Sequence, residues 1–172
     1  MTVKGGVDLQ AISKEHGWAQ QMSESGDMPL ALAMTGITGF RFPEADSSLC
    51  TYCADAIVCV PMATMMATNP DKRFDDVEVL HGKRLEPTPG YKHTLLVGAC
   101  QVKKNRNNPL INHCVMIDGC PPEMERLPAA CKEVGIDLPE DILETYARSP
   151  EIFHMSRYVG RPEFDDGFFN IQ

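Results

Sequence analysis

The chain has 172 residues, of which 43% are hydrophobic, and carries a formal net charge of −8. This length suits one domain and can bury a core that needs no disulfides. The acidic balance argues against nucleic-acid binding, because neutralising phosphates requires clustered Lys and Arg. The longest apolar run, residues 56–67, contains a proline and is too short to span a membrane. The amino terminus lacks the apolar segment of a signal peptide, so we expect a cytoplasmic protein.

The first part of the chain predicts four elements from hydrophobic spacing and glycine positions. In chain order these are a helix over 7–23, a buried strand over 29–34, a glycine-rich turn over 35–40 and a helix over 54–68. We expect Ser47 or Ser48 to cap the last of these helices and Pro61 to kink it.

The second part alternates strands with helices. It predicts strands over 75–80, 94–99 and 115–118, then helices over 123–135 and 139–148. Such alternation favours an α/β fold, a layered sheet with flanking helices. We expect one domain over 1–150 and a separate acidic, aromatic tail over 151–172.

Seven cysteines are many for a chain of this kind, and in a reducing compartment they favour metal binding or burial over disulfides. Cys50 and Cys53 form a C-x-x-C at the expected amino end of a helix, where thiolates are favoured. Cys100 and Cys120 close two successive predicted strands. Because ligands of α/β sheets bind beyond the carboxyl ends of strands, we expect these four thiols to share a site.

The spacing leaves the nature of the metal open. Structural zinc usually uses two close cysteine pairs, whereas here the second pair is split between Cys100 and Cys120. Single ligands scattered after one close pair fit an iron–sulfur cluster better. Zinc, and no metal at all, remain alternatives.

The cysteine pattern also resembles known families. C-x-x-C, then G-x-C after a strand, then G-C-P-P is similar to the proximal-cluster framework of nickel–iron hydrogenase small subunits and to the cluster subunit of respiratory complex I. The stretches VGACQVKKNRNNP and IDGCPPEMERLPAACKEVGI resemble the C-terminal part of the family called domain of unknown function 362. The resemblance spans about 49–136 and implies an anaerobic redox setting with a [4Fe–4S] cluster on Cys50, Cys53, Cys100 and Cys120.

The remaining cysteines are expected to have other roles. Cys59 and Cys131 lie in apolar helical patterns and are predicted core residues. Cys114 follows a histidine and precedes a strand, so it is an alternative ligand.

Basic and imidazole side chains are weaker candidates for chemistry. The segment after Cys100 is a predicted basic loop that is either simply solvated or compensates a negative cluster and grips an anionic substrate or acidic partner. Its candidate residues, with the histidine that follows, are Lys103, Lys104, Arg106 and His113. His81 and His93 are weak candidates for acid–base work.

Three functions follow. The first is electron transfer by a four-cysteine cluster, together with a redox partner subunit or as a homo-oligomer. The second is a hydro-lyase type of enzyme, in which three cysteines hold the cluster and an open iron acts on a small anionic substrate. The third is a zinc-stabilised interaction module.

Overall fold

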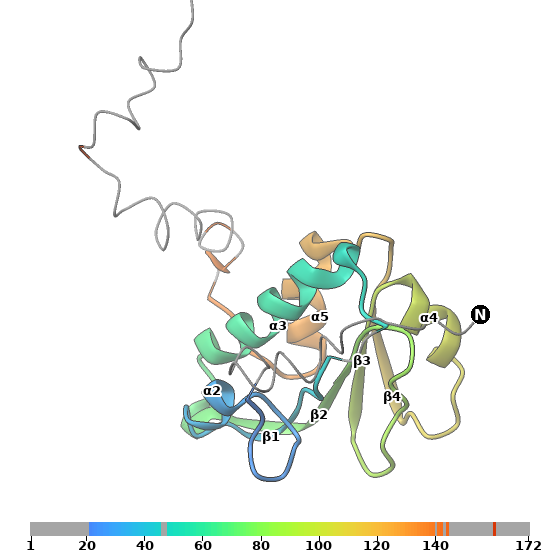
Figure 1. The fold of residues 1–172 in the computed structure, drawn as a ribbon. Coiled ribbons are helices and arrows are strands. Elements are labelled where there is room, and N and C mark those ends of the chain that lie inside the picture. Colours follow the sequence, from blue (N-terminus) through green and yellow to red (C-terminus); the bar gives the residue numbers. More distant parts are fainter. Residues whose placement is uncertain (1–20, 46–47, 140, 143, 145–159, 161–172) are drawn as a thin grey trace, which may run out of the picture.

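The computed structural model describes residues 21–45, 48–139, 141–142, 144 and 160. Its centre is one parallel sheet, with strands in the order β1-β2-β3-β4 (Figure 1). The strands are β1 (Thr38–Arg41), β2 (Arg73–Leu80), β3 (His93–Val97) and β4 (His113–Ile117). The expected α/β layered fold is confirmed.

Helices cover both faces of this sheet. The α-helices are α2 (Leu30–Ala33), α3 (Ala54–Met66), α4 (Ala99–Asn105) and α5 (Leu127–Glu133). Three short 3-10 turns accompany them: η1 (Thr51–Cys53), η2 (Pro70–Lys72) and η3 (Met124–Arg126). α3 and α5 lie on one face and α4 on the other (Figure 1).

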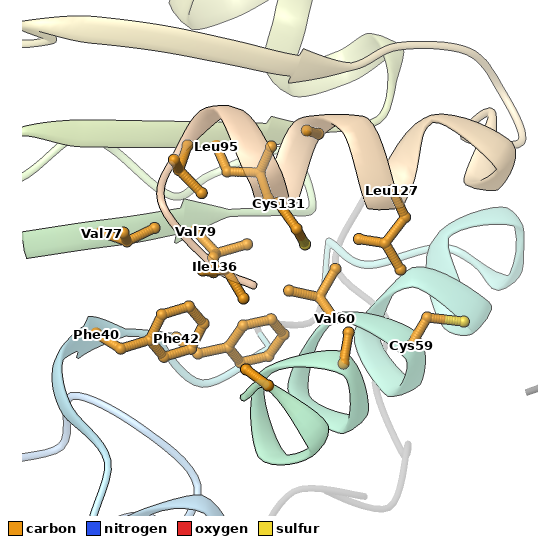
Figure 2. Close-up of a cluster of buried hydrophobic side chains, with 14 of the residues drawn as sticks. Phe40, Phe42, Cys59, Val60, Val77, Val79, Leu95, Leu127, Cys131 and Ile136 are labelled. Carbon is orange, nitrogen blue, oxygen red and sulfur yellow. The ribbon is translucent and has the colours of Figure 1, made fainter. Parts of the chain in front are cut away.

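The larger core lies between the sheet and the pair α3 and α5. Val79 and Leu95 of the sheet face Val60 of α3 and Leu127 of α5, and all are at most 1% exposed (Figure 2). Strands covered on both faces read as continuous apolar runs, which is how β3 and β4 could be found, whereas β2 was found from its alternation of apolar and polar residues. The expected strands 75–80, 94–99 and 115–118 are confirmed as β2, β3 and β4.

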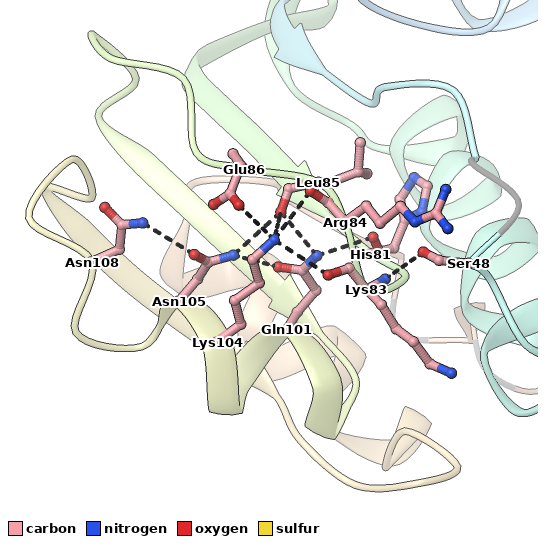
Figure 3. Close-up of polar contacts among 10 residues, drawn as sticks. All are labelled: Ser48, His81, Lys83, Arg84, Leu85, Glu86, Gln101, Lys104, Asn105 and Asn108. Atoms are coloured by element: carbon pink, nitrogen blue, oxygen red, sulfur yellow. Dashed lines mark hydrogen bonds and ion pairs between the residues drawn. The ribbon is translucent and has the colours of Figure 1, made fainter.

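The core on the opposite face of the sheet is smaller and is bordered by buried polar side chains. Leu80 and Leu96 pack there with Val102 of α4. Beside them, Gln101 and Asn105 are 0% and 1% exposed. The Gln101 side-chain amide donates to the carbonyls of His81 (3.2 Å) and Leu85 (3.3 Å), and Asn105 donates to Gln101 at 2.7 Å (Figure 3). Hydrogen bonds therefore hold α4 against the segment that follows β2.

Two predictions in the first part of the chain are wrong. Residues 29–34 contain helix α2 rather than a strand, and β1 occupies the second half of the predicted turn. Gly39 explains the second error. It has a φ of +68°, and a Cβ there would lie 2.1 Å from the Phe74 carbonyl oxygen. The glycine therefore serves close strand approach at a register shift between β1 and β2.

The helical predictions fare better. α3 confirms the helix over 54–68 and runs unbroken through Pro61, and η3 with α5 confirms the helix over 123–135. Ser48 does not cap α3, since its hydroxyl accepts a hydrogen bond from the Lys83 amide at 2.8 Å. The predicted basic loop after Cys100 is wrong, because that segment is helix α4.

Other expectations lie outside the described residues, wholly or in large part. These are the helix over 7–20, Ser47, most of the helix over 139–148 and the tail over 151–172, apart from Gly160. The last part of the first helix, residues 21–23, is not helical, because Met22 forms a β-bridge with Pro29.

Candidate functional site: four thiols at the carboxyl end of the sheet

Two of the candidate cysteines lie in the turns that leave β3 and β4. Cys100 follows Gly98 and stands in the first turn of α4, and Cys120 follows Gly119 in the turn after β4. We expected each cysteine to close its strand. This prediction is wrong, because each strand ends before its cysteine. Gly98 and Gly119 have φ values of +87° and +105°, which turn the chain sharply at the sheet edge.

Backbone hydrogen bonds join these two turns. The Gly98 amide donates to the Ile117 carbonyl, and the Ala99 amide donates to the Gly119 carbonyl, both at 2.8 Å. The peptide bond between Cys120 and Pro121 is cis. The two turns therefore act as one unit and bring Cys100 and Cys120 to the same edge of the sheet.

The C-x-x-C segment reaches this edge from the start of α3. Cys50 precedes η1 and is half-buried, whereas Cys53 ends η1 directly before α3 and is 7% exposed. A Cβ on Gly98 would lie 3.1 Å from the Cys53 sulfur and 3.6 Å from the Pro122 ring. The Cys53 thiol thus lies directly against the turn between β3 and α4, in a space that a larger residue at position 98 would enter.

The thiols influence one another electrostatically. Burial, with smaller contributions from the thiols of Cys50, Cys100 and Cys120, raises the pKa of Cys53 to about 11. The backbone amide of Tyr52 lowers the pKa of Cys50. Cys100 and Cys120 are exposed. The structure therefore brings together the four cysteines that the sequence singled out, from three separate segments. We call this place, at the carboxyl end of the sheet, the four-thiol edge.

This donor set fits an iron–sulfur cluster. Four neighbouring thiols cannot all carry negative charge without a compensating cation, and thiolates are the ligands of iron–sulfur clusters and of structural zinc. All seven cysteines are free thiols. Among the described residues, no three His, Cys, Asp or Glu side chains form a group that could hold a metal ion.

The other three cysteines lie elsewhere. Cys59 and Cys131 belong to the larger core, as expected, and burial raises the pKa of Cys131 to about 12. Cys114 lies near the amino end of β4 and packs against the smaller core. Burial raises its pKa, and the charge of Arg106 opposes this. The structure therefore does not bring Cys114 to the four-thiol edge.

The basic candidates are divided by the fold. Lys104 is anchored: its ammonium donates to the carbonyls of Lys83 (3.3 Å), Arg84 (3.1 Å) and Leu85 (3.4 Å) and pairs with Glu86 at 2.6 Å (Figure 3). Its observed role is to hold the segment after β2.

Of the remaining candidates, Lys103 is exposed on α4. Arg106 caps the end of α4 that is farther from Cys100. His113 begins β4, so it stands at the opposite end of that strand from Cys120. Arg106 and His113 therefore do not line the four-thiol edge.

Lys83 is a neighbour of the site that sequence reasoning missed. Its positive charge contributes to lowering the pKa of Cys50. Its amide is held by Ser48, while its side chain extends away from the hydrogen-bonded network around Lys104 (Figure 3). No local pattern indicates this proximity, because it depends on how the segment after β2 folds back. The glycine before each of Cys100 and Cys120 was a usable signal for the turns.

The remaining histidines are bound into the structure. His81 is 1% exposed, and its Nε2 lies 3.0 Å from the Pro43 carbonyl oxygen. At the amino end of the sheet, the Nδ1 atoms of His93 and His113 lie 2.7 Å apart. Their Nε2 atoms approach Asp75 (3.9 Å) and Glu133 (3.4 Å), respectively. His93 and His113 thus stand at the amino end of the sheet, whereas the buried His81 follows β2 directly at the carboxyl end.

Comparison with known proteins gives no relative. No family model matches the chain, and no curated protein or solved structure does so either. Over the part of the chain that the structure describes, no helix has the length and apolar character needed to cross a membrane.

Proposed function

We propose that this chain is an iron–sulfur protein that transfers electrons, with a [4Fe–4S] cluster bound by Cys50, Cys53, Cys100 and Cys120. The observation that carries the proposal is the convergence of these four thiols on one edge of the sheet, where they perturb the pKa of Cys53. Clusters of this type are held by four cysteine thiolates.

The scattered spacing of the four cysteines along the chain supports a cluster over a single zinc ion. A zinc ion draws four sulfur atoms onto one point, whereas each cysteine of a cluster binds a different iron atom and so stands at the border of a larger volume. Gly98 supports the same reading, because its missing side chain leaves space beside the Cys53 sulfur.

Electron transfer suits a cluster with four protein ligands, since no iron is left open for a substrate. When bound, the cluster supplies one-electron redox chemistry. Cys53 is buried, while Cys100 and Cys120 are exposed, so one side of the site is shielded and the other is accessible to a redox partner. Lys83 adds positive charge beside Cys50. A positive charge near a cluster stabilises its reduced form and so raises its reduction potential.

The cellular setting is part of the same proposal. A reducing compartment such as the cytoplasm keeps exposed thiols from forming disulfides. We place the protein there, with a separate redox partner that meets the exposed side of the four-thiol edge.

The test is anaerobic cluster reconstitution on single cysteine variants. Changing Cys50, Cys53, Cys100 or Cys120 to Ser should reduce bound iron and acid-labile sulfide to background levels. Cys114→Ser is the matched control, because this half-buried cysteine lies outside the four-thiol edge, and it should retain full loading. Loading that is unaffected by all four substitutions would contradict the proposal.

Two alternatives would show themselves in the same experiment. If one of the four variants kept its cluster, ligation by three cysteines and an open iron would be favoured, as in a hydro-lyase. Added small carboxylic acids would then change the electron paramagnetic resonance signal. Stoichiometric zinc without sulfide would favour the zinc-stabilised interaction module.

A further inference from the structure

β4 ends the sheet among the described residues and presents an unpaired edge. Beside this edge lies a groove of about 130 Å³ between β4 and α5, lined in part by Val115, Met116, Ala129 and Ala130. Met116 is 38% exposed. Arg126 and Glu133 also line it, so the groove is partly apolar and partly charged. An unpaired edge strand is a ready template for pairing with another strand.

The backbone of β4 specifies how a strand could pair there. The Ile117 carbonyl accepts from the Gly98 amide, so the main chain of Ile117 faces β3. Because backbone groups alternate in direction along a strand, Val115 also faces β3, whereas Cys114 and Met116 face the open edge. The outward groups are thus placed symmetrically about Val115, as pairing of two identical antiparallel strands requires.

Two exposed charges of opposite sign flank this groove, one directly before α5 and one at its last residue. Glu133 ends α5 close to the start of β4, since it lies 3.4 Å from His113, and Arg126 stands at the other end of the groove. The side chains of Arg126 and Glu133 are 58% and 56% exposed. Between them lies Ala129, a small exposed residue that allows another helix to approach closely, while Ala130 is 5% exposed and packs in the larger core.

We propose that two copies of this chain associate through β4, with the strands antiparallel about a two-fold axis at Val115. Cys114 of each copy then pairs through its backbone with Met116 of the other, and the two sheets become continuous. The same axis sets Arg126 of one copy against Glu133 of the other, twice. A two-fold interface needs such a self-complementary surface. This proposal is independent of the cluster.

Charge reversal tests the interface. Sedimentation velocity of the full chain over a concentration series should show a dimer. Arg126→Glu and Glu133→Arg each place like charges together, so each should weaken the dimer at least about tenfold. The double variant restores the opposite charges and should restore the dimer. Lys132→Glu, an exposed neighbour on α5 with the same charge change as Arg126→Glu, should have no effect.

The outcomes separate clearly. A monomer at every concentration would overturn the proposal. So would a dimer that both single reversals leave intact, because it would use another surface. Both reversed side chains are exposed, so the fold should persist in each variant, and far-ultraviolet circular dichroism checks this.

Discussion

The two ends of the parallel sheet differ in how their ionisable groups are compensated. At the amino end, His93 and His113 hydrogen bond to each other, and each approaches a carboxylate, Asp75 or Glu133. At the carboxyl end, thiols meet thiols, and Cys53 has a raised pKa through burial and through its neighbours. The histidines of the amino end thus have partners among the protein's own side chains, whereas at the carboxyl end the cluster that we propose would compensate the thiolates.

The two ends of the sheet also differ in how the backbone places these side chains. Turns with positive φ at Gly98 and Gly119 bring reactive groups together at the carboxyl end without strands to separate them. At the amino end, the matched register of His93 with His113 places the two rings side by side on neighbouring strands. We propose a ligand for the first arrangement, whereas the second joins two neighbouring strands.

The largest expected effect comes from Gly98→Ala. The added Cβ would lie 3.1 Å from the Cys53 sulfur, and the backbone angles, φ +87° and ψ +153°, favour glycine. We expect a loss of roughly 1–3 kcal/mol in the free energy of unfolding, and markedly lower iron loading. Urea denaturation and iron analysis measure these effects.

Gly90→Ala is the control for that prediction. Gly90 also has a positive φ, +101°, but a Cβ there would meet nothing within 4 Å. The variant should lose stability through strain alone and keep its iron. Equal loss of iron in both variants would show that strain, rather than contact with Cys53, is responsible.

The next effect concerns the segment that carries Lys83. Lys104→Met removes the ammonium that binds three successive carbonyls and Glu86, and should cost about 1–2 kcal/mol of unfolding free energy. Lys103→Met is the matched control on the same helix and should change stability by less than about 0.5 kcal/mol. Thermal or urea unfolding decides between them, and equal losses would refute the anchoring role of Lys104.

A smaller effect is expected at the amino end. Burial, assisted by the charge of His113, lowers the pKa of His93 below its ordinary value of 6.5. The unfolded chain therefore binds a proton before the folded chain does as the pH falls below 6.5, and the free energy of unfolding should decrease in that window. At higher pH His93 is neutral in both the folded and the unfolded chain, so its contribution to the free energy of unfolding is fully present.

His93→Gln should remove this part of the pH dependence and lower stability by roughly 1 kcal/mol at neutral pH, while iron loading is unchanged. Urea titrations between pH 5 and about 8 provide the measurement. If the variant lost its iron, the two ends of the sheet would be coupled, which would contradict their independence.

The smallest effect is electrostatic. Lys83→Gln removes a positive charge near Cys50, so the reduction potential of the bound cluster should become more negative. The shift should shrink as salt is added, because exposed charges are screened. Lys132→Gln on α5 is the control for loss of a distant positive charge. Redox titration followed by electron paramagnetic resonance measures both, and an equal shift in both variants would contradict a local effect.

The buried parts of the fold could be predicted from sequence because hydrophobic pattern reports burial directly. β3 and β4 contain short apolar runs, β2 was found from its alternation of apolar and polar residues, and α3 and α5 contribute apolar positions to one core. The run over 29–34 misled because a short apolar run fits a buried helix as well as a strand. Glycine at position 39 suggested a turn where it permits close strand approach.

Helix α4 could not be found in this way. Its buried face includes Gln101 and Asn105, whose burial depends on hydrogen bonds to a segment distant in sequence. For the site, residue type and spacing singled out four cysteines, and the thiols whose charges act on Cys53 are the other three of that set. Residue type and spacing could not predict that Cys100 begins a helix, or that Lys83 approaches Cys50, since both follow from tertiary contacts.

The central claim is that the four-thiol edge binds a [4Fe–4S] cluster. The most direct measurement is iron and acid-labile sulfide per chain, on protein purified or reconstituted without oxygen. The account predicts about four of each per chain, and a reduced-state electron paramagnetic resonance signal that disappears in Cys53→Ser. Protein that takes up neither iron nor sulfide under these conditions would contradict it.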